Sequence, residues 1–94
     1  MIRVLIERRI AEGLADYYDK TIKRTVSAVV AAPGCISGES LKDSNNVNRR
    51  IVMSKWESME DWQSWYRSDA RRNVIAEITP MLEEREKITL LELT

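Results

Sequence analysis

The chain has 94 residues, of which 44% are hydrophobic and 32% charged, so it fits a single globular domain, residues 1–94, with no room for a second. Its 15 Lys and Arg residues balance its 15 Asp and Glu residues, which gives no basis for binding nucleic acid or an anionic membrane surface. The absence of histidine excludes His-ligated zinc, His-ligated haem and nucleophiles activated by histidine.

The N-terminal segment and the single cysteine favour a cytoplasmic protein. Charges at positions 3, 7, 8 and 9 interrupt the apolar run that a signal peptide needs, and no apolar run reaches the length of a membrane span. Cys35 has no partner for an internal disulfide, which fits a reducing compartment. We interpret Cys35 as a small, half-buried residue at the start of a strand, in preference to a reactive thiol. No metal site is expected, because neighbouring acidic residues such as Glu83 and Glu84 do not share a helical face.

The first half of the chain predicts a strand followed by a helix. From Ile2 to Arg9, Ile2, Val4 and Ile6 fall on one side and Arg3, Leu5 and Glu7 on the other, which is the period of a strand. Between residues 13 and 31, apolar side chains recur every three or four positions, so we expect an amphipathic helix of about five turns. Pro33 and Gly34 then end this helix.

The second half predicts a hairpin, a helix that restarts once, and a last strand. Residues 35–41 and 48–56 flank the polar turn 42–46, so they are expected to pair as antiparallel strands. Ser58 and Ser68 are the expected N-caps of two successive helical stretches, and Thr79-Pro80 forms a short turn after them. Residues 87–93 are expected to form the closing strand.

This order of elements predicts an α+β, ferredoxin-like βαββαβ sandwich with a four-stranded antiparallel sheet and helices on one face. The last strand carries Ile88 and Leu90 on one side but Leu91 and Leu93 on the other, and residues 51–56 are also apolar on both sides. Both sheet faces therefore need to be buried. Since the helices cover only one, we expect a homodimer whose open sheet faces pack together.

Two clusters of side chains stand out. All three tryptophans lie at the junction between the third strand and the following helix, and such large aromatic groups must line either a core or a pocket. Three arginine pairs, Arg8-Arg9, Arg49-Arg50 and Arg71-Arg72, each lie near acidic residues. We expect these pairs to form a solvated, charged face.

Three short motifs together resemble the antibiotic biosynthesis monooxygenase (ABM) family. They are Ala-Pro-Gly-Cys at residues 32–35, Lys-Trp-Glu-Ser at residues 55–58, and Trp65 followed by Ser68-Asp69. Their order and spacing extend over nearly the whole chain. The resemblance implies a dimeric α+β barrel of ferredoxin-like subunits, which agrees with the fold that the periodicity predicts.

The ABM family is similar in fold to haem-degrading monooxygenases, whose sites use an asparagine on the first strand, a helical tryptophan and a haem-ligating histidine. The tryptophan corresponds to Trp65 in this chain. The histidine position falls on Ile75, however, and the asparagine position on about Arg8. Because isoleucine cannot coordinate iron, we do not expect haem degradation.

Other ABM members resemble oxygenases that need no cofactor, because an electron-rich aromatic or quinol-forming substrate supplies the electrons that activate oxygen. The resemblance therefore implies a cofactor-independent monooxygenase that acts on a small aromatic or quinone-like molecule. The candidate catalytic residues are Trp65, Tyr18 and Arg50, with Arg50 stabilising a substrate anion and Tyr18 orienting or deprotonating a phenol. The pocket is expected between sheet and helices, lined by Trp56, Trp62, Tyr17, Val26 and Ile75.

Ordinary core packing is the alternative for each of these aromatic residues. For the whole protein, the alternative is a dimeric small-ligand-binding or stress-associated module that keeps the fold and the pocket but catalyses no reaction. The missing histidine and asparagine favour that alternative. Oxygen uptake in the presence of candidate substrates distinguishes the two hypotheses.

Overall fold

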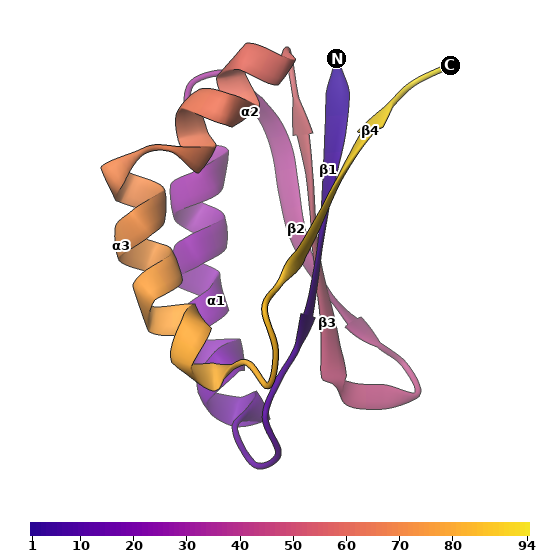
Figure 1. Ribbon diagram of the computed structural model, residues 1–94, viewed down its shortest axis with the longest axis vertical. Coiled ribbons are helices and arrows are strands. Elements are labelled where there is room, and N and C mark those ends of the chain that lie inside the picture. The colour runs from indigo at the N-terminus through magenta and orange to yellow at the C-terminus, as the bar shows by residue number, and fades with distance from the viewer.

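All helices of the computed structural model lie on one side of a four-stranded sheet, and the structure describes residues 1–94 (Figure 1). The strands are β1 (Ile2–Arg9), β2 (Cys35–Asp43), β3 (Asn46–Trp56) and β4 (Lys87–Glu92). The helices are α1 (Ala15–Val30), α2 (Met59–Tyr66) and α3 (Asp69–Ile78), followed by the 3-10 helix η1 (Thr79–Met81). This arrangement confirms the predicted ferredoxin-like α+β fold.

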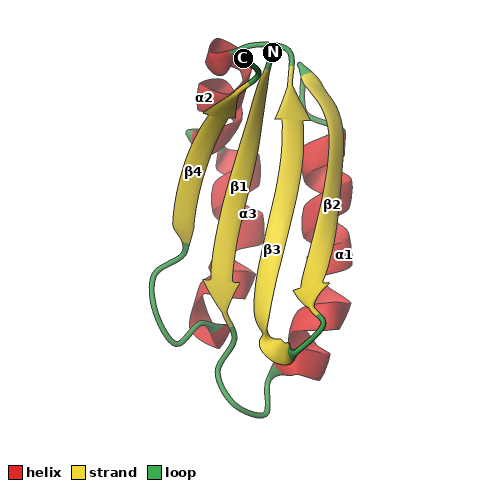
Figure 2. Ribbon diagram, turned by 90° about the vertical axis from the view of Figure 1, so that its right-hand side faces the viewer, coloured by secondary structure: helices red, strands yellow, loops and turns green.

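The sheet is antiparallel throughout and has the strand order β2-β3-β1-β4. Figure 2 shows β1 and β3 at the centre of the sheet, with both chain ends at the same end of the molecule. In the β1–β3 ladder, Ile2 pairs with Trp56 and Arg8 pairs with Arg50. The register therefore sets two arginines opposite each other at the far end of the central strands.

Serine side chains begin α2 and α3, as predicted. The Ser58 hydroxyl oxygen accepts a hydrogen bond from the Asp61 N–H at 3.1 Å, and the Ser68 hydroxyl accepts one from the Arg71 N–H at 3.1 Å. Each cap of this kind contributes about 1 kcal/mol to stability. The second cap separates the two helices, and α3 packs against α1 while α2 covers the end of β3.

The core fills the space between the helices and the inner face of the sheet. Its buried hydrophobic residues are Ile2, Val4, Ile6, Ile10, Tyr18, Ile22, Val29, Val52, Trp56, Trp62, Trp65 and Ile78. The opposite face of the sheet is partly apolar, since Ile51 and Met53 are half-buried and Leu41 and Leu91 are exposed in the single chain. No helix is long and apolar enough to span a membrane.

The turn between α1 and β2 depends on Gly34, which has a φ of +82°. A Cβ at this position would lie 2.2 Å from Asp61 Cγ, whereas a Cβ at Gly13, with a φ of +83°, would have nothing within 4 Å. We expect Gly13→Ala to lower the free energy of unfolding by about 1–2 kcal/mol, through left-handed strain alone. Gly34→Ala should cost about 1–3 kcal/mol more, because Asp61 must also move.

Urea unfolding curves of the two glycine variants, recorded at one protein concentration, measure this difference. The two backbone angles match, so the Gly13 variant is the control for strain. Equal losses of stability in the two variants would contradict the prediction, since they would mean that Asp61 moves aside without cost to the α2 cap.

Candidate functional site

A small cavity lies between the inner face of the sheet and the helices. Its lining residues, eight of them hydrophobic, are Ile6, Arg8, Thr25, Val26, Val29, Val52, Ser54, Trp62, Trp65, Arg71, Val74 and Ile75. The cavity has a volume of about 20 Å³, which is room for about one water molecule. A ligand larger than a water molecule must therefore displace some of these side chains.

Four of the predicted site residues line this cavity together. Val26 comes from α1, Trp62 and Trp65 from α2, and Ile75 from α3. They converge because each lies on the stripe of its helix that faces the sheet. Ile75 thus lies on the cavity wall.

The other four predicted residues lie outside the lining. Trp56 is fully buried behind Trp62, with ring centroids 5.7 Å apart in an edge-on arrangement. Tyr17 is 65% exposed on the solvent side of α1. Tyr18 and Arg50 lie next to each other beside Arg8, where the cavity lining becomes polar.

Tyr18 is fully buried between two guanidinium groups. Arg8 Nη1 donates a hydrogen bond to the Tyr18 hydroxyl at 3.1 Å, and Arg50 Cζ lies 5.3 Å from the centre of the Tyr18 ring. Arg50 also pairs with Asp19 and donates from Nε to the Val47 carbonyl at 2.7 Å. Its Nη2 is buried without a partner, an arrangement that costs about 1–3 kcal/mol.

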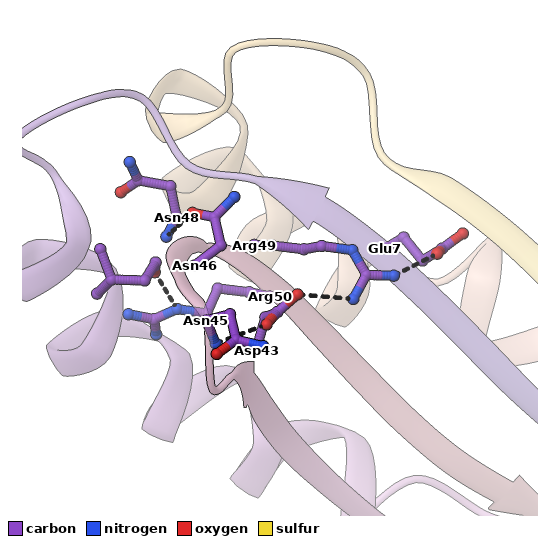
Figure 3. A network of polar contacts seen from close by, with 8 residues as sticks. Glu7, Asp43, Asn45, Asn46, Asn48, Arg49 and Arg50 are labelled. Atoms are coloured by element: carbon purple, nitrogen blue, oxygen red, sulfur yellow. Dashed lines mark hydrogen bonds and ion pairs between the residues drawn. The ribbon is translucent and has the colours of Figure 1, made fainter.

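The prediction that the three arginine pairs form a solvated face is wrong for one member of each pair. The side chains of Arg8, Arg50 and Arg71 are 2%, 3% and 10% exposed, whereas their partners in the pairs are 40–73% exposed. Figure 3 shows Arg49 reaching toward Glu7 while Arg50 turns away from it. On β1 and β3, neighbouring side chains point to opposite faces of the sheet, so one arginine of each strand pair faces the core, and on α3 Arg71 lies on the buried side of the helix.

Glu86 neutralises two of the buried arginines. Arg8 Nε donates to Glu86 Oε2 at 2.9 Å, and Arg71 Nη2 donates to Glu86 Oε1 at 2.5 Å. The Glu86 side chain is 14% exposed, and the Arg71 guanidinium lies 4.8 Å from the centre of the Tyr66 ring. We call Arg8, Glu86 and Arg71 the ionic triad; none of its members was predicted as a site residue.

A wider groove of about 670 Å³ lies on the outer surface beside Trp65. It is lined by Ala28, Ala31, Ala32, Pro33, Asp61, Ser64, Trp65, Ser68 and Ala70. Its polar groups already serve the helix caps, since Ser58 Oγ donates to the Asp61 carboxylate at 2.9 Å and Ser68 Oγ donates to the Trp65 carbonyl at 2.6 Å. The groove contains no cation, so the inner cavity is the better candidate site.

The polar groups of the cavity suit an anion better than a metal ion. The polar residues of its lining are Arg8, Thr25, Ser54 and Arg71, and guanidiniums match the geometry of carboxylate and similar oxygen groups. No group of three or more His, Cys, Asp or Glu side chains is placed to hold a metal ion. The polar residues of this lining are therefore of a kind that can pair with an anionic oxygen group.

Cys35 lies outside the cavity, half-buried at the first position of β2. Burial raises the pKa of its thiol, so less of it is thiolate at neutral pH than in a free thiol. Because only the thiolate reacts, we expect iodoacetamide to alkylate Cys35 more slowly than it alkylates glutathione at pH 8, and faster as the pH rises. A rate equal to that of glutathione, measured by mass spectrometry, would contradict this.

Comparison with known proteins gives the family. Residues 1–77 match the family described as antibiotic biosynthesis monooxygenase. A crystal structure of an antibiotic biosynthesis monooxygenase superposes with a TM-score of 0.91 at 12% identity, covering 100% of this chain and 99% of the other. A conserved protein from Methanosarcina mazei Go1 has a TM-score of 0.92 at 15% identity, covering 99% and 92%.

A third solved structure is a mutant of SnoaB, described as a cofactor-independent oxygenase from Streptomyces nogalater. It has a TM-score of 0.84 at 11% identity and covers 98% of this chain and 92% of its own. At such identities these structures show a shared fold, and the sequence matches none of the curated proteins. The family match extends from β1 into α3 and includes all three tryptophans, so the chain belongs to the antibiotic biosynthesis monooxygenase family.

Proposed function

We propose that this protein is a cofactor-independent monooxygenase that oxidises a small aromatic, quinol-like substrate in the inner cavity. The observation that carries the proposal is an apolar pocket, walled by Trp62, Trp65 and Ile75, whose lining also includes the two buried arginines Arg8 and Arg71. The apolar walls suit an aromatic ring, and the cations suit negative charge on its oxygen. Membership of the ABM family and the description of SnoaB support oxygenase chemistry.

In such a reaction the substrate supplies all the electrons. In the keto tautomer of the substrate, two C–H bonds of the activated ring methylene break, one atom of O2 becomes its carbonyl oxygen, and the other atom leaves as water. The deprotonated substrate is the electron donor, so a pocket that stabilises the phenolate or enolate raises the population of the reactive form. Arg8 and Arg71 reach the cavity for this purpose, while Tyr18 and Arg50 act as positioning residues through Arg8.

Oxygen uptake with a panel of anthrones and hydroquinones tests the proposal. We expect Trp65→Ala to lower the catalysed rate by about 10–100-fold, because loss of the ring removes a cavity wall that orients the substrate. Tyr17→Ala is the matched aromatic control, since Tyr17 is exposed and its loss should leave the rate unchanged. Uptake at the uncatalysed rate, together with quenching of tryptophan fluorescence on binding, would instead support the binding module.

The non-catalytic binding module remains the second candidate function. The observation that favours it is the small volume of the closed cavity, about 20 Å³, together with Arg8 and Ile75 at positions where related haem enzymes have functional residues. In this case the cavity opens to hold a ligand but the ligand is released unchanged. Under either function we propose a cytoplasmic location, because the single cysteine fits a reducing compartment.

We further propose that the protein is a homodimer formed through the open sheet face. Leu41 and Leu91 are 43% and 41% exposed on that face, and the Arg49 ion pair with Glu7 lies beside the apolar patch. Sedimentation velocity at micromolar concentration should show a dimer, and Met53→Lys should shift it toward monomer. Tyr17→Lys, on the helical side, is the control; a monomeric wild-type protein would refute the homodimer.

A further inference from the structure

We infer that the Glu86 carboxylate occupies the place of a ligand anion, and that the cavity binds an aromatic molecule whose anionic oxygen group displaces Glu86 from Arg8 and Arg71. The inference rests on the proposed function only in taking the inner cavity as the ligand site. It deepens the proposed function by requiring the ligand to carry its negative charge when it binds, and it assigns Glu86 as the residue that competes with that charge.

The charge balance among the buried arginines points to an anion. The side chains of Arg8, Arg50 and Arg71 are buried, and Glu86 is the only carboxylate partner enclosed with them. The other acidic partner, Asp19, is 52% exposed, and one Arg50 nitrogen has no partner at all. Buried cations require compensating negative charge, so the site holds more cation than its enclosed carboxylate neutralises.

The three members of the ionic triad differ in whether they line the inner cavity or the outer surface. Arg8 and Arg71 both line the inner cavity, whereas Glu86 does not. Glu86 instead lines an outer depression of about 520 Å³, which shares Arg71 and Ile75 with the cavity. Arg8 lines a second outer depression of about 250 Å³. The two guanidiniums therefore stand between cavity and solvent, and Glu86 reaches them from outside.

Glu86 can leave this position without disturbing the sheet. It precedes β4, and residues 83–86 belong to no helix or strand. An anion in the cavity binds the same two guanidiniums, so it competes with Glu86 for their N–H donors. An anionic ligand keeps both cations paired after Glu86 swings outward, whereas a neutral ligand cannot replace the Glu86 carboxylate and gains no charge-assisted hydrogen bond from them. The triad thus selects charged over neutral aromatic ligands.

The expected ratio of affinities for charged and neutral ligands follows from the strength of charge-assisted hydrogen bonds. Replacing them by contacts to a neutral group changes affinity by about 10–100-fold. Glu86 competes for the same donors in the free protein, so neutralising it should strengthen anion binding by about tenfold or more. The amide of Glu86→Gln keeps a similar shape and one acceptor, which limits the disturbance of the triad.

Isothermal titration at pH 7 with 2-naphthoate and 2-naphthamide tests the inference, because the two probes share a ring system and differ in charge. We expect wild-type protein to bind 2-naphthoate at least about tenfold more tightly than 2-naphthamide. Glu86→Gln should bind 2-naphthoate about tenfold more tightly again, with no change for 2-naphthamide. Glu84→Gln, an exposed carboxylate of the same loop, is the matched control and should change neither affinity.

Equal affinity for the two probes in the wild-type protein, or no binding of either, would overturn the inference. If Glu86→Gln does not fold, Arg71→Leu provides the test, because it should abolish the preference for 2-naphthoate; a preference that survives would also overturn it. The proposed function is tested separately. A preference for 2-naphthoate without catalysed oxygen uptake would contradict the oxygenase but support this inference. Catalysed oxygen uptake without that preference would support the oxygenase but contradict this inference.

Discussion

Replacing Trp56 with alanine is expected to lower the free energy of unfolding by about 3–5 kcal/mol. Trp56 is fully buried, its ring packs edge-on against Trp62, and its Nε1 donates to the Ser54 hydroxyl at 2.9 Å. Removing the ring leaves a cavity and an unpaired hydroxyl in the core. Since a domain of this size is stable by about 5–15 kcal/mol in total, the variant should lie close to unfolding at 25 °C.

Urea unfolding followed by circular dichroism measures this loss, with the protein concentration held fixed because self-association would add to stability. Trp56→Phe keeps an aromatic ring and should lose only about 1–2 kcal/mol, mostly through the missing hydrogen bond. Tyr17→Ala should stay within about 0.5 kcal/mol of wild type, since Tyr17 is exposed. A loss below about 1 kcal/mol for Trp56→Ala would contradict the prediction.

The three tryptophans thus have separable roles. Trp56 packs behind Trp62 and does not line the cavity, whereas Trp62 and Trp65 do. We expect substitution of Trp56 to change stability, and substitution of Trp65 to change oxygen uptake as well. Because all three fall between residues 56 and 65, proximity in the sequence could not assign these roles; the direction in which each ring points decides them.

The fold was predictable because its determinants are local. Alternation in residues 2–9 places Ile2, Val4 and Ile6 on the buried face, and the serines at 58 and 68 cap two helices. On α1, the structure has Tyr18 fully buried and Tyr17 65% exposed. Apolar spacing and capping residues specify these features without help from distant parts of the chain.

The ionic triad was not predictable in the same way. Arg8 continues the series of inward-facing residues Ile2, Val4 and Ile6. An arginine at the end of a strand is usually solvated, however, so its charge led to the prediction that it is exposed. Its burial depends on Glu86, which is 78 positions away and lies in a segment without periodicity. Arg50 on β3 is a similar case, because it lies two residues before the buried Val52 and therefore on the same face of the sheet. Only the paired strands bring such residues together.

Replacing Glu86 with alanine is expected to lower the free energy of unfolding by about 3–5 kcal/mol, because it leaves two buried guanidiniums without their carboxylate. Glu84→Ala is the control, since that carboxylate is exposed and lies 4.0 Å from an exposed Arg9; it should cost less than about 1 kcal/mol. Unfolding in urea at constant ionic strength compares the two. Equal losses would show that water enters and solvates Arg8 and Arg71.

A triple variant separates stability from ligand binding. Replacing a whole buried ion cluster by apolar residues of similar size is often neutral or stabilising by about 1–4 kcal/mol, because the cost of desolvating the charges disappears. We therefore expect Arg8→Met combined with Arg71→Leu and Glu86→Leu to be more stable than Glu86→Ala, yet to lose any preference for 2-naphthoate over 2-naphthamide. A triple variant as unstable as Glu86→Ala would mean that the triad holds the fold together. A stable one without charge preference would mean that the charges serve the ligand.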